Sequence, residues 1–249
     1  MKYFKKKAMA AAALGAAAAV MISFPALAGW NQDEKGWSYT DDSGNQMINT
    51  WLEQPDEWYF LDEQGYMVSN CYRKIGAIYY GFDKKGAWTG DIFPDIEAGA
   101  WNGRTYVNSW SGLTMTVPES ALVFSASQMG IIGKSSMFQE FGLKVNDGTN
   151  AVVQLGYEYA GNLDSGVETT IEAYGNLAAV QLYERGCVPT SFRPVSLQGR
   201  EYYKLSATKG GVEYCDLYIR KTGGYFEVIS ASYGIGSVNQ VDKILAGVR

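Results

Sequence analysis

Histidine is absent from this sequence of 249 residues. Histidine is the commonest general base and the commonest metal ligand in proteins. Its absence excludes Ser-His-Asp and Cys-His catalysis and every zinc site that uses an imidazole ligand. An enzyme built from this chain would have to work with carboxylate, tyrosine, lysine or cysteine side chains. We assign no catalytic residue, and we expect neither a metal site nor a cofactor.

Cysteine is scarce, with residues only at Cys71, Cys187 and Cys215. The number is odd, so at least one thiol stays unpaired within a monomer. Cys187 and Cys215 lie in the same half of the sequence and form a candidate disulfide. Cys215 also alternates with apolar residues in a strand-like run, so a buried, reduced thiol is the alternative interpretation.

Long apolar runs are confined to the N-terminus. Four lysines within the first seven residues precede an alanine-rich stretch from Ala8 to Phe24, and an Ala-x-Ala site ends at Ala28. This pattern is typical of a secretory signal peptide over residues 1–28, with an uncleaved anchor as the alternative. We expect no membrane anchor after cleavage, because no later run of apolar residues is long enough to span a bilayer.

Basic residues are fewer than acidic residues. The chain carries 21 Lys+Arg and 26 Asp+Glu, a net charge of −5, and removal of the four leader lysines makes it −9. This acidic balance argues against nucleic acid and anionic membranes as partners.

Aromatic residues, in contrast, are abundant and regularly spaced. Residues 29–93 hold five of the seven tryptophans and 14 aromatic residues in total. Four series of residues recur at a spacing of 21 without a slip, which indicates stacked repeat units. The series are Trp30, Trp51, Tyr72 and Phe93; Trp37, Trp58 and Tyr79; Asp41, Asp62 and Asp83; and Gly44, Gly65 and Gly86.

Each repeat has the same internal order. An aromatic strand (Trp37–Thr40, Trp58–Leu61 or Tyr79–Phe82) is followed by an Asp-x-x-Gly turn and a short second strand. Aspartate caps such a turn, and glycine supplies its residue with positive φ. One hairpin cannot bury an aromatic face alone. The sequence therefore predicts a β-hairpin solenoid of about three 21-residue repeats over residues 29–97.

Four segments of the repeats share short aromatic and glycine motifs: Gly29-Trp30, Gly36–Tyr39, Trp58–Asp62 and Gly65–Met67. They resemble the cell-wall-binding (choline-binding) repeats of Gram-positive surface proteins, whose pattern is roughly Gly-Trp, then Trp-Tyr-Tyr-Phe-Asp, then Gly-x-Met. The resemblance implies that the repeats hold the protein on the wall. In that family, aromatic rings of adjacent repeats enclose the choline of teichoic acids, and close relatives bind glucans or other wall polymers.

The resemblance implies that Trp37, Trp51 and Trp58 form one candidate cage for a ligand, which Met47 lines. Quaternary ammonium groups are held by aromatic faces through cation–π attraction, at roughly 0.5–2 kcal/mol per contact. The alternatives are that these rings only form the core of the repeats, or that they stack on sugars.

A second candidate cage would use Trp58, Tyr72 and Tyr79, lined by Met67. It departs from the family pattern, because tyrosine replaces tryptophan at two places and Asn70-Cys71 stands before Tyr72.

Residues 98–249 predict a separate α+β domain, an antiparallel sheet packed between helices. The element order resembles the PsbP-like α/β/α sandwich, which implies a fold but no activity. Strands are expected near residues 106–108, 113–117, 141–145, 151–159, 201–207, 212–220 and 225–232, with helices over 118–129, from a Ser165–Glu168 capping box to about 185, and from Ser237 onward.

Taken together, these features predict a secreted, non-enzymatic protein of the Gram-positive cell wall. The repeats would bind choline-substituted teichoic acid or a glycan without a covalent link, because the C-terminus has no Leu-Pro-x-Thr-Gly motif. The C-terminal domain would be displayed for an unknown protein partner. The alternatives are a wall hydrolase that works through carboxylates, and a structural or adhesin protein whose repeats bind no small ligand.

Overall fold

The computed structural model describes residues 28–249 apart from 134–135, 147, 149 and 164–169. The expected signal peptide lies outside these residues. Within the described part of the chain, no helix combines the length and the apolarity needed to cross a membrane.

The chain divides into two compact units. The first, here called the repeat unit, comprises residues up to Asn70 together with Phe82–Thr89; the second, the sheet unit, comprises Cys71–Gly81 and Gly90–Arg249. This division differs from the expected boundary at residues 97 and 98. Part of the third repeat belongs to the sheet unit because its aromatic side chains pack into that core, as described below.

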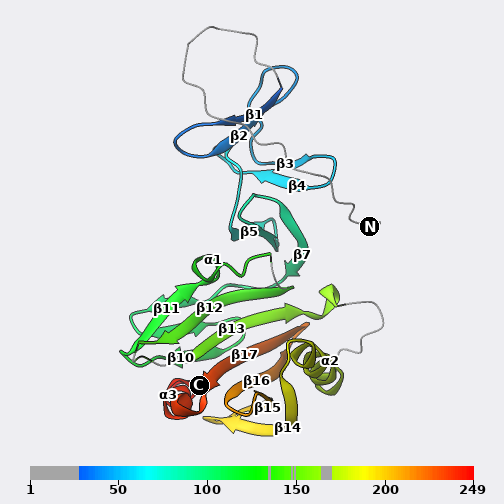
Figure 1. The fold of residues 1–249 in the computed structure, drawn as a ribbon. Coiled ribbons are helices and arrows are strands. Elements are labelled where there is room, and N and C mark those ends of the chain that lie inside the picture. The colour runs from blue at the N-terminus through cyan, green and yellow to red at the C-terminus, as the bar shows by residue number, and fades with distance from the viewer. Residues whose placement is uncertain (1–27, 134–135, 147, 149, 164–169) are drawn as a thin grey trace. The chain divides into compact units, whose positions relative to one another are not determined.

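Small antiparallel sheets make up the repeats (Figure 1). Strand β1 (Gly29–Gln32) pairs with β2 (Trp37–Thr40), and β3 (Thr50–Glu53) pairs with β4 (Trp58–Leu61). The third sheet has the order β5-β6-β7, with β5 at Cys71–Ile75, β6 at Ile78–Phe82 and β7 at Trp88–Pro94. The three aromatic strands predicted from the sequence are thus confirmed, whereas a solenoid stays a prediction.

The three Asp-x-x-Gly turns have one geometry. The glycine N–H of each turn donates to the aspartate carbonyl at 3.0 Å, and the glycines have φ of 82°, 80° and 85°. The aspartate carboxylates also accept hydrogen bonds from the backbone N–H groups two and four residues later, at 2.8–3.0 Å. The predicted turn chemistry is confirmed at all three positions.

A further repeating contact links each of the last two turns to the preceding segment. The N–H of Asn49 donates to the carbonyl of Asp62, and the N–H of Asn70 donates to that of Asp83, both at 2.8 Å. Both asparagines adopt positive φ, at 46° and 50°, which asparagine tolerates better than most residues. Their spacing of 21 was not recognised in the sequence.

The sheet unit is built on a seven-stranded antiparallel sheet with the order β11-β12-β13-β17-β16-β15-β14. Its strands are β11 (Ala121–Ser125), β12 (Met137–Val145), β13 (Val152–Tyr159), β14 (Val188–Leu197), β15 (Arg200–Lys209), β16 (Glu213–Thr222) and β17 (Tyr225–Gly234). A three-stranded sheet of β8 (Ala100–Asn102), β9 (Thr105–Asn108) and β10 (Leu113–Thr116) accompanies it. The helices are α1 (Ala126–Met129), α2 (Ile171–Glu184) and α3 (Val238–Leu245), with single 3₁₀ turns at Ala160–Asn162 and Ile235–Ser237.

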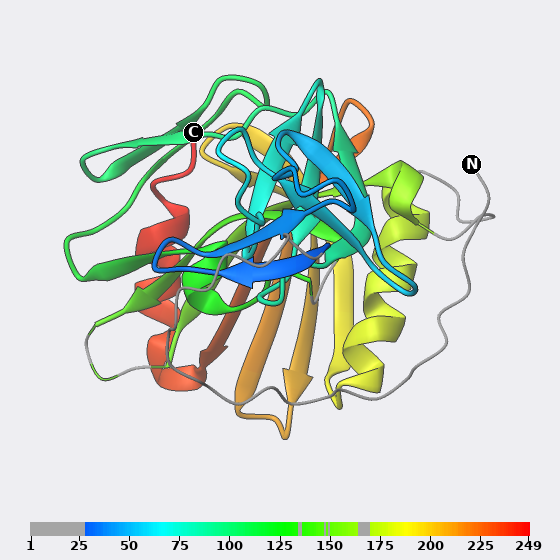
Figure 2. The same cartoon turned by 90° about the horizontal axis from the view of Figure 1, so that it is seen from above.

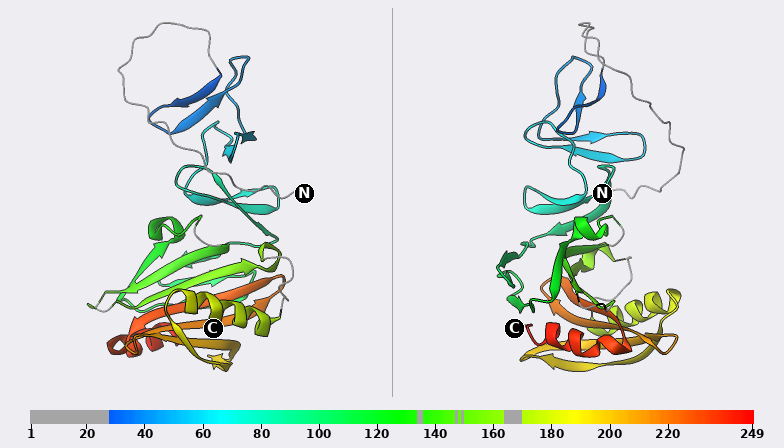
Figure 3. Two further views of the ribbon diagram at one scale, coloured as in Figure 1. Left: turned by 45° about the vertical axis from the view of Figure 1, so that its right-hand side comes forward. Right: turned by 60° about the vertical axis from the view of Figure 1, so that its left-hand side comes forward.

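The two long helices pack on opposite faces of the large sheet (Figure 2). Tyr174, Ala178 and Leu182 of α2 join the apolar cluster on one face, and Val241 and Ile244 of α3 join the cluster on the other. Alternation along the strands separates the clusters, since successive side chains point to opposite faces. Figure 3 shows the same layers from two further sides. The domain is therefore mostly β, with a helix on each face of the sheet.

Several elements differ from the sequence-based expectation. Strands β1, β3, β5 and β8 were not predicted, and the short strand expected after each Asp-x-x-Gly turn forms only at β7, because Gln46 and Met67 make isolated bridges. Residues 118–129 form strand β11 and the single turn α1 instead of one helix, because Pro118 opens a turn and β11 pairs with β12. Strand β14 was not predicted. It carries two prolines and alternates poorly, but it lies at the sheet edge, where proline is tolerated because one side of the strand needs no ladder bonds.

The predicted helix ends are partly correct. Helix α2 ends before Gly186, which has φ of 81° as expected for a stop. The predicted Ser165–Glu168 capping box lies outside the described residues, and the N-cap of α2 is Thr170. Ser237 precedes α3 but makes no capping hydrogen bond with its side chain, so that part of the prediction is wrong.

Candidate functional site

The first tryptophan of each complete repeat occupies the centre of an aromatic cluster. Trp30 pairs in register with Tyr39 across β1 and β2, and their ring centroids are 5.3 Å apart. Trp51 pairs in the same way with Phe60 across β3 and β4, also at 5.3 Å. Cross-strand partners lie close enough for ring contact, so the hairpin register itself assembles the start of each cluster.

Each cluster contains a nearly perpendicular tryptophan pair. The rings of Trp30 and Trp37 are 6.5 Å apart at 87°, and those of Trp51 and Trp58 are 6.4 Å apart at 75°. These two arrangements are separated by one repeat of 21 residues. Edge-to-face contact is a geometry that aromatic pairs prefer in packing, and aromatic cages for quaternary ammonium ligands are built from such neighbouring rings.

Later segments contribute further rings to both clusters. Tyr59 contacts Trp30 at 5.2 Å, while Phe82 and Trp88 contact Trp51 at 5.7 and 5.9 Å. None of these three rings was assigned to a cage from the sequence. Trp30 was also left out of the predicted cages, although it heads the first 21-residue series.

Burial separates packing rings from rings that a ligand can reach. Phe60 and Phe82 are 3% and 0% exposed and therefore belong to the core of the repeat unit. Trp37 is 41% exposed, and Trp58 is half-buried. Trp37 and Trp58 are therefore accessible to solvent, while buried Phe60 and Phe82 pack against Trp51.

The first predicted cage is brought together in part. Trp51 and Trp58 are in contact, whereas the ring of Trp37 contacts Trp30. Met47 donates its backbone N–H to the carbonyl of Tyr39 at 2.9 Å, which fixes it beside the first hairpin. That these residues hold a ligand stays a prediction.

The methionine of the second predicted cage has a repeating backbone position. Met67 donates its N–H to the carbonyl of Trp37 at 2.7 Å, which ties the second repeat to the first. Its side chain lies directly over Gly86, where an added Cβ would come within 2.5 Å of Met67 Sδ. The turn glycine is therefore needed for close approach as well as for its positive φ.

The two tyrosines of the second predicted cage belong to the sheet unit. The ring of Tyr72 lies 4.6 Å from Phe138 and 5.6 Å from Phe93, and Tyr79 lies 5.2 Å from Phe138. The hydroxyl of Tyr72 donates to the carbonyl of Met137 at 2.8 Å, and burial raises the pKa of Tyr72 to about 12. These contacts give both rings a packing role within the sheet unit, which is the alternative considered from the sequence.

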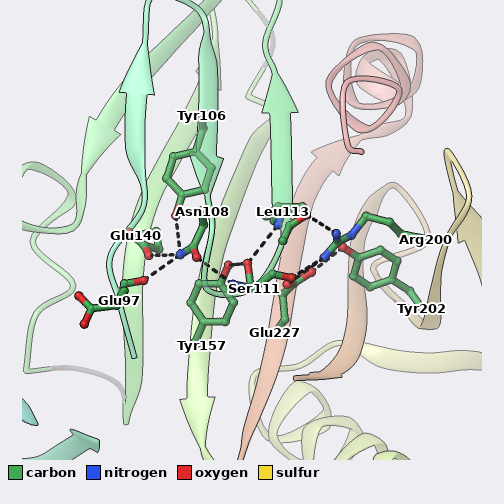
Figure 4. A network of polar contacts seen from close by, with 11 residues as sticks. Glu97, Tyr106, Asn108, Ser111, Leu113, Glu140, Tyr157, Arg200, Tyr202 and Glu227 are labelled. Atoms are coloured by element: carbon green, nitrogen blue, oxygen red, sulfur yellow. Dashed lines mark hydrogen bonds and ion pairs between the residues drawn. The ribbon is translucent and has the colours of Figure 1, made fainter. Parts of the chain in front are cut away.

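Carboxylates of the sheet unit take part in a buried polar network (Figure 4). The amide nitrogen of Asn108 donates to Glu140 Oε1 at 3.1 Å and to the carbonyl of Glu97 at 3.0 Å. Asn108 Oδ1 accepts the N–H of Ser111 at 3.0 Å, and the Ser111 hydroxyl bonds that of Tyr157 at 2.8 Å. The network therefore holds the β9–β10 turn against the large sheet.

The other half of this network surrounds Glu227, which is fully buried. Its carboxylate accepts from Tyr202 at 2.5 Å and lies 3.5 Å from Arg200 Nη2. Arg200 also donates to the carbonyls of Ser111 and Gly112. Because Glu227 is buried, the network accounts for the packing of the turn against the large sheet.

Within the described residues, no group of three His, Cys, Asp or Glu side chains is placed to hold a metal ion. All three cysteines are free thiols in the structure. Cys187 and Cys215 line the same cavity of about 330 Å³, and their pairing stays a prediction.

No family model and no curated protein matches the chain. The chain is similar over 25% of its length to 92% of the choline-binding domain of Spr1274 from Streptococcus pneumoniae, at 24% identity and a TM-score of 0.23. Over 32% of its length it is similar to 28% of a multimodular pneumococcal cell-wall endolysin of phage Cp-1 complexed with choline, at 20% identity and a TM-score of 0.24.

A third solved structure is similar over a larger share of the chain. It is cyanobacterial PsbP from Synechocystis, with 61% of this chain and 97% of that one covered, 12% identity and a TM-score of 0.40. The structural neighbours thus include choline-binding cell-wall proteins and a PsbP protein. At these TM-scores the likenesses carry no argument about function, which has to be argued from the residues of the site.

Proposed function

We propose that the repeat unit binds a cell-wall polymer through the tryptophan pairs Trp30–Trp37 and Trp51–Trp58. The observation that carries this proposal is the recurrence, at one repeat's spacing, of a perpendicular and partly exposed indole pair. Recurring sites at constant spacing suit a polymer whose ligand groups also recur, because several weak contacts then act together.

The charge of the repeat unit favours a cationic group on that polymer. Residues 29–70 and 82–89 contain ten acidic residues and three lysines, a net charge of −7. Two of the acids lie beside aromatic residues: Tyr59 donates to Glu57 at 2.5 Å, and Tyr66 donates to Asp33 at 2.8 Å. A quaternary ammonium group such as choline is attracted both by the indole faces and by this negative field.

In this proposal the protein is exported through residues 1–28 and attaches to the wall without a covalent link. The repeats stack as a solenoid, and the sheet unit has no catalytic role and is displayed outward. The ligand is the choline of a substituted teichoic acid. A glycan that stacks on the same indoles is the competing ligand.

Retention on an immobilised choline resin tests the proposal. We expect the purified protein to be retained and then eluted by free choline, while glucose at the same concentration leaves it bound. Elution by glucose and not by choline would assign the site to a glycan. Passage through both a choline and a glycan resin would overturn wall binding by the repeats and favour a structural role.

A further inference from the structure

A cavity of about 540 Å³ lies on the α2 face of the large sheet. Helix α2 packs against β14, β15 and β16, and the cavity opens beside it over β12, β13 and β17. Its wall on the helix side includes Tyr174, Gln181 and Arg185, and Arg185 makes no ion pair with a carboxylate of the described residues. The volume is in the range of small-molecule sites in proteins.

Polar side chains form the floor of this cavity, in the middle of the sheet. Gln154 on β13 is in register with Ser230 on β17, and Gln139 on β12 lies beside them. Helix α2 covers β14, β15 and β16 and leaves this part of the sheet face open, so polar side chains can line it.

Gly156 leaves room for the side chains of Met137 and Gln139 at the floor of the cavity. A Cβ added there would lie 2.6 Å from Met137 Sδ and 3.0 Å from Gln139 Oε1. Any larger residue would push these side chains into the space above β13.

Glu158 supplies a buried carboxylate to the same cavity. It is 9% exposed and accepts hydrogen bonds from the hydroxyls of Tyr174 at 2.6 Å and Ser136 at 2.5 Å. No cationic side chain of the described residues forms an ion pair with it. A carboxylate has about four acceptor positions, and these two hydroxyls occupy two of them. Glu158 therefore keeps acceptor positions for the hydrogen-bond donors of a ligand.

The neighbouring amides have unused hydrogen-bonding capacity. Gln139 Oε1 is buried and has no partner. Gln154 Oε1 accepts only a long bond of 3.4 Å from the Ser230 hydroxyl. Buried polar atoms are nearly always satisfied in native proteins, so these groups point to a ligand that carries hydroxyl or amide groups.

We propose that this cavity binds a small amino sugar, with its protonated primary amine on Glu158 and its hydroxyls on Gln139, Gln154 and Ser230. The open acceptor positions of Glu158 can take charged N–H donors, which a primary ammonium has and a quaternary ammonium lacks. The site is therefore chemically distinct from the choline site proposed for the repeats, and neither proposal depends on the other.

Calorimetric titration of the purified protein with glucosamine and with N-acetylglucosamine tests this site. The two sugars differ in the charge of one nitrogen. We expect saturable binding of glucosamine at roughly millimolar concentrations, as suits a ligand of this size. The acetylated sugar should bind at least about tenfold more weakly, because a hydrogen bond to a charged group is lost.

Three variants locate the binding. Glu158→Gln keeps the shape and should weaken glucosamine binding about tenfold. Glu172→Gln removes an exposed carboxylate of α2 that does not line the cavity, and its affinity should stay within about twofold of the wild type, because surface charges contribute little. Gln139→Leu removes the unpartnered amide, so its thermal stability should be kept while its affinity falls about threefold or more.

Gln139→Leu also keeps the proposal testable if Glu158→Gln fails to fold. Equal binding of the two sugars would overturn the proposal. So would the absence of saturable glucosamine binding, or an affinity unchanged in both cavity variants.

Discussion

The ring of Trp58 stands at 75° to the ring of Trp51, with their centroids 6.4 Å apart. The same arrangement joins Trp37 to Trp30 one repeat earlier. In both pairs the first tryptophan packs against several other rings, and the second lies at its edge. The two members of a pair therefore have different roles, which substitution can separate.

Trp37→Ala should weaken binding while leaving folding largely intact. The Trp37 ring is 41% exposed and contacts a single ring among the described aromatic pairs, so its removal creates little cavity. We expect retention on choline resin to fall severalfold and the free energy of unfolding to fall by about 1 kcal/mol or less. Tyr183→Ala, at a tyrosine that is 67% exposed on α2, is the matched control and should be retained like the wild type. Full retention of Trp37→Ala would remove Trp37 from the proposed site.

Trp51→Ala should act mainly on stability. The Trp51 ring contacts Trp58, Phe60, Phe82 and Trp88, so truncation leaves a cavity within the repeat unit. We expect a loss of about 3–5 kcal/mol, measured on the unfolding transition of the repeat unit. A loss as small as that of Trp37→Ala would contradict the assignment of Trp51 to the core of its cluster.

Tyr202→Phe should destabilise the sheet unit, because it removes the donor to buried Glu227. A hydrogen bond to a charged group contributes about 1.5–3 kcal/mol, and chemical denaturation should show a loss of that size. Tyr203→Phe is the control at the next residue, where the tyrosine ring contacts Phe192 and is only half-buried. Equal losses in the two variants would show that the Glu227 bond contributes nothing specific.

The stability of the sheet unit should decrease as pH rises, because the carboxyl of Glu140 loses its proton. Burial is the largest effect on this carboxyl and raises its pKa above the ordinary value of 4.5. The folded state then binds more protons than the unfolded state, so the contribution to stability is complete below pH 4.5 and is lost as pH rises through the folded-state pKa. Glu140→Gln should remove this part of the pH dependence of the free energy of unfolding, which denaturation experiments at a series of pH values from 4.5 upward would measure. The same pH dependence of stability in Glu140→Gln and the wild type would contradict a raised pKa for Glu140.

A disulfide between Cys187 and Cys215 should form in the exported protein under oxidising conditions. The two thiols line one cavity and pack in the same apolar cluster. The bond would close a loop of moderate length and raise stability by about 3 kcal/mol. Peptide mapping without reductant should recover the linked peptides in Cys71→Ser and not in Cys187→Ser. Recovery of free thiols at both positions would leave the reduced pair as the native state.

The repeat strands and turns were predictable because their determinants are local. The series that starts at Asp41 specifies a turn from four residues, and the structure contains the same turn three times. Strand β14 was not predictable in this way. Its prolines and weak alternation are acceptable only at a sheet edge, and its edge position is set by the rest of the sheet.

The candidate sites also combine features that are local in the sequence with contacts between distant residues. The sequence alone determined the 21-residue spacing of the rings, the acidic balance and the absence of histidine, because each can be read from residue identity and order. Only the tertiary structure decided that Tyr72 packs against Phe138 and that Glu158 lines an open cavity without an ion pair to a described residue. These relationships join residues far apart in the chain, and their contacts depend on strand order and helix packing, which residue spacing does not specify.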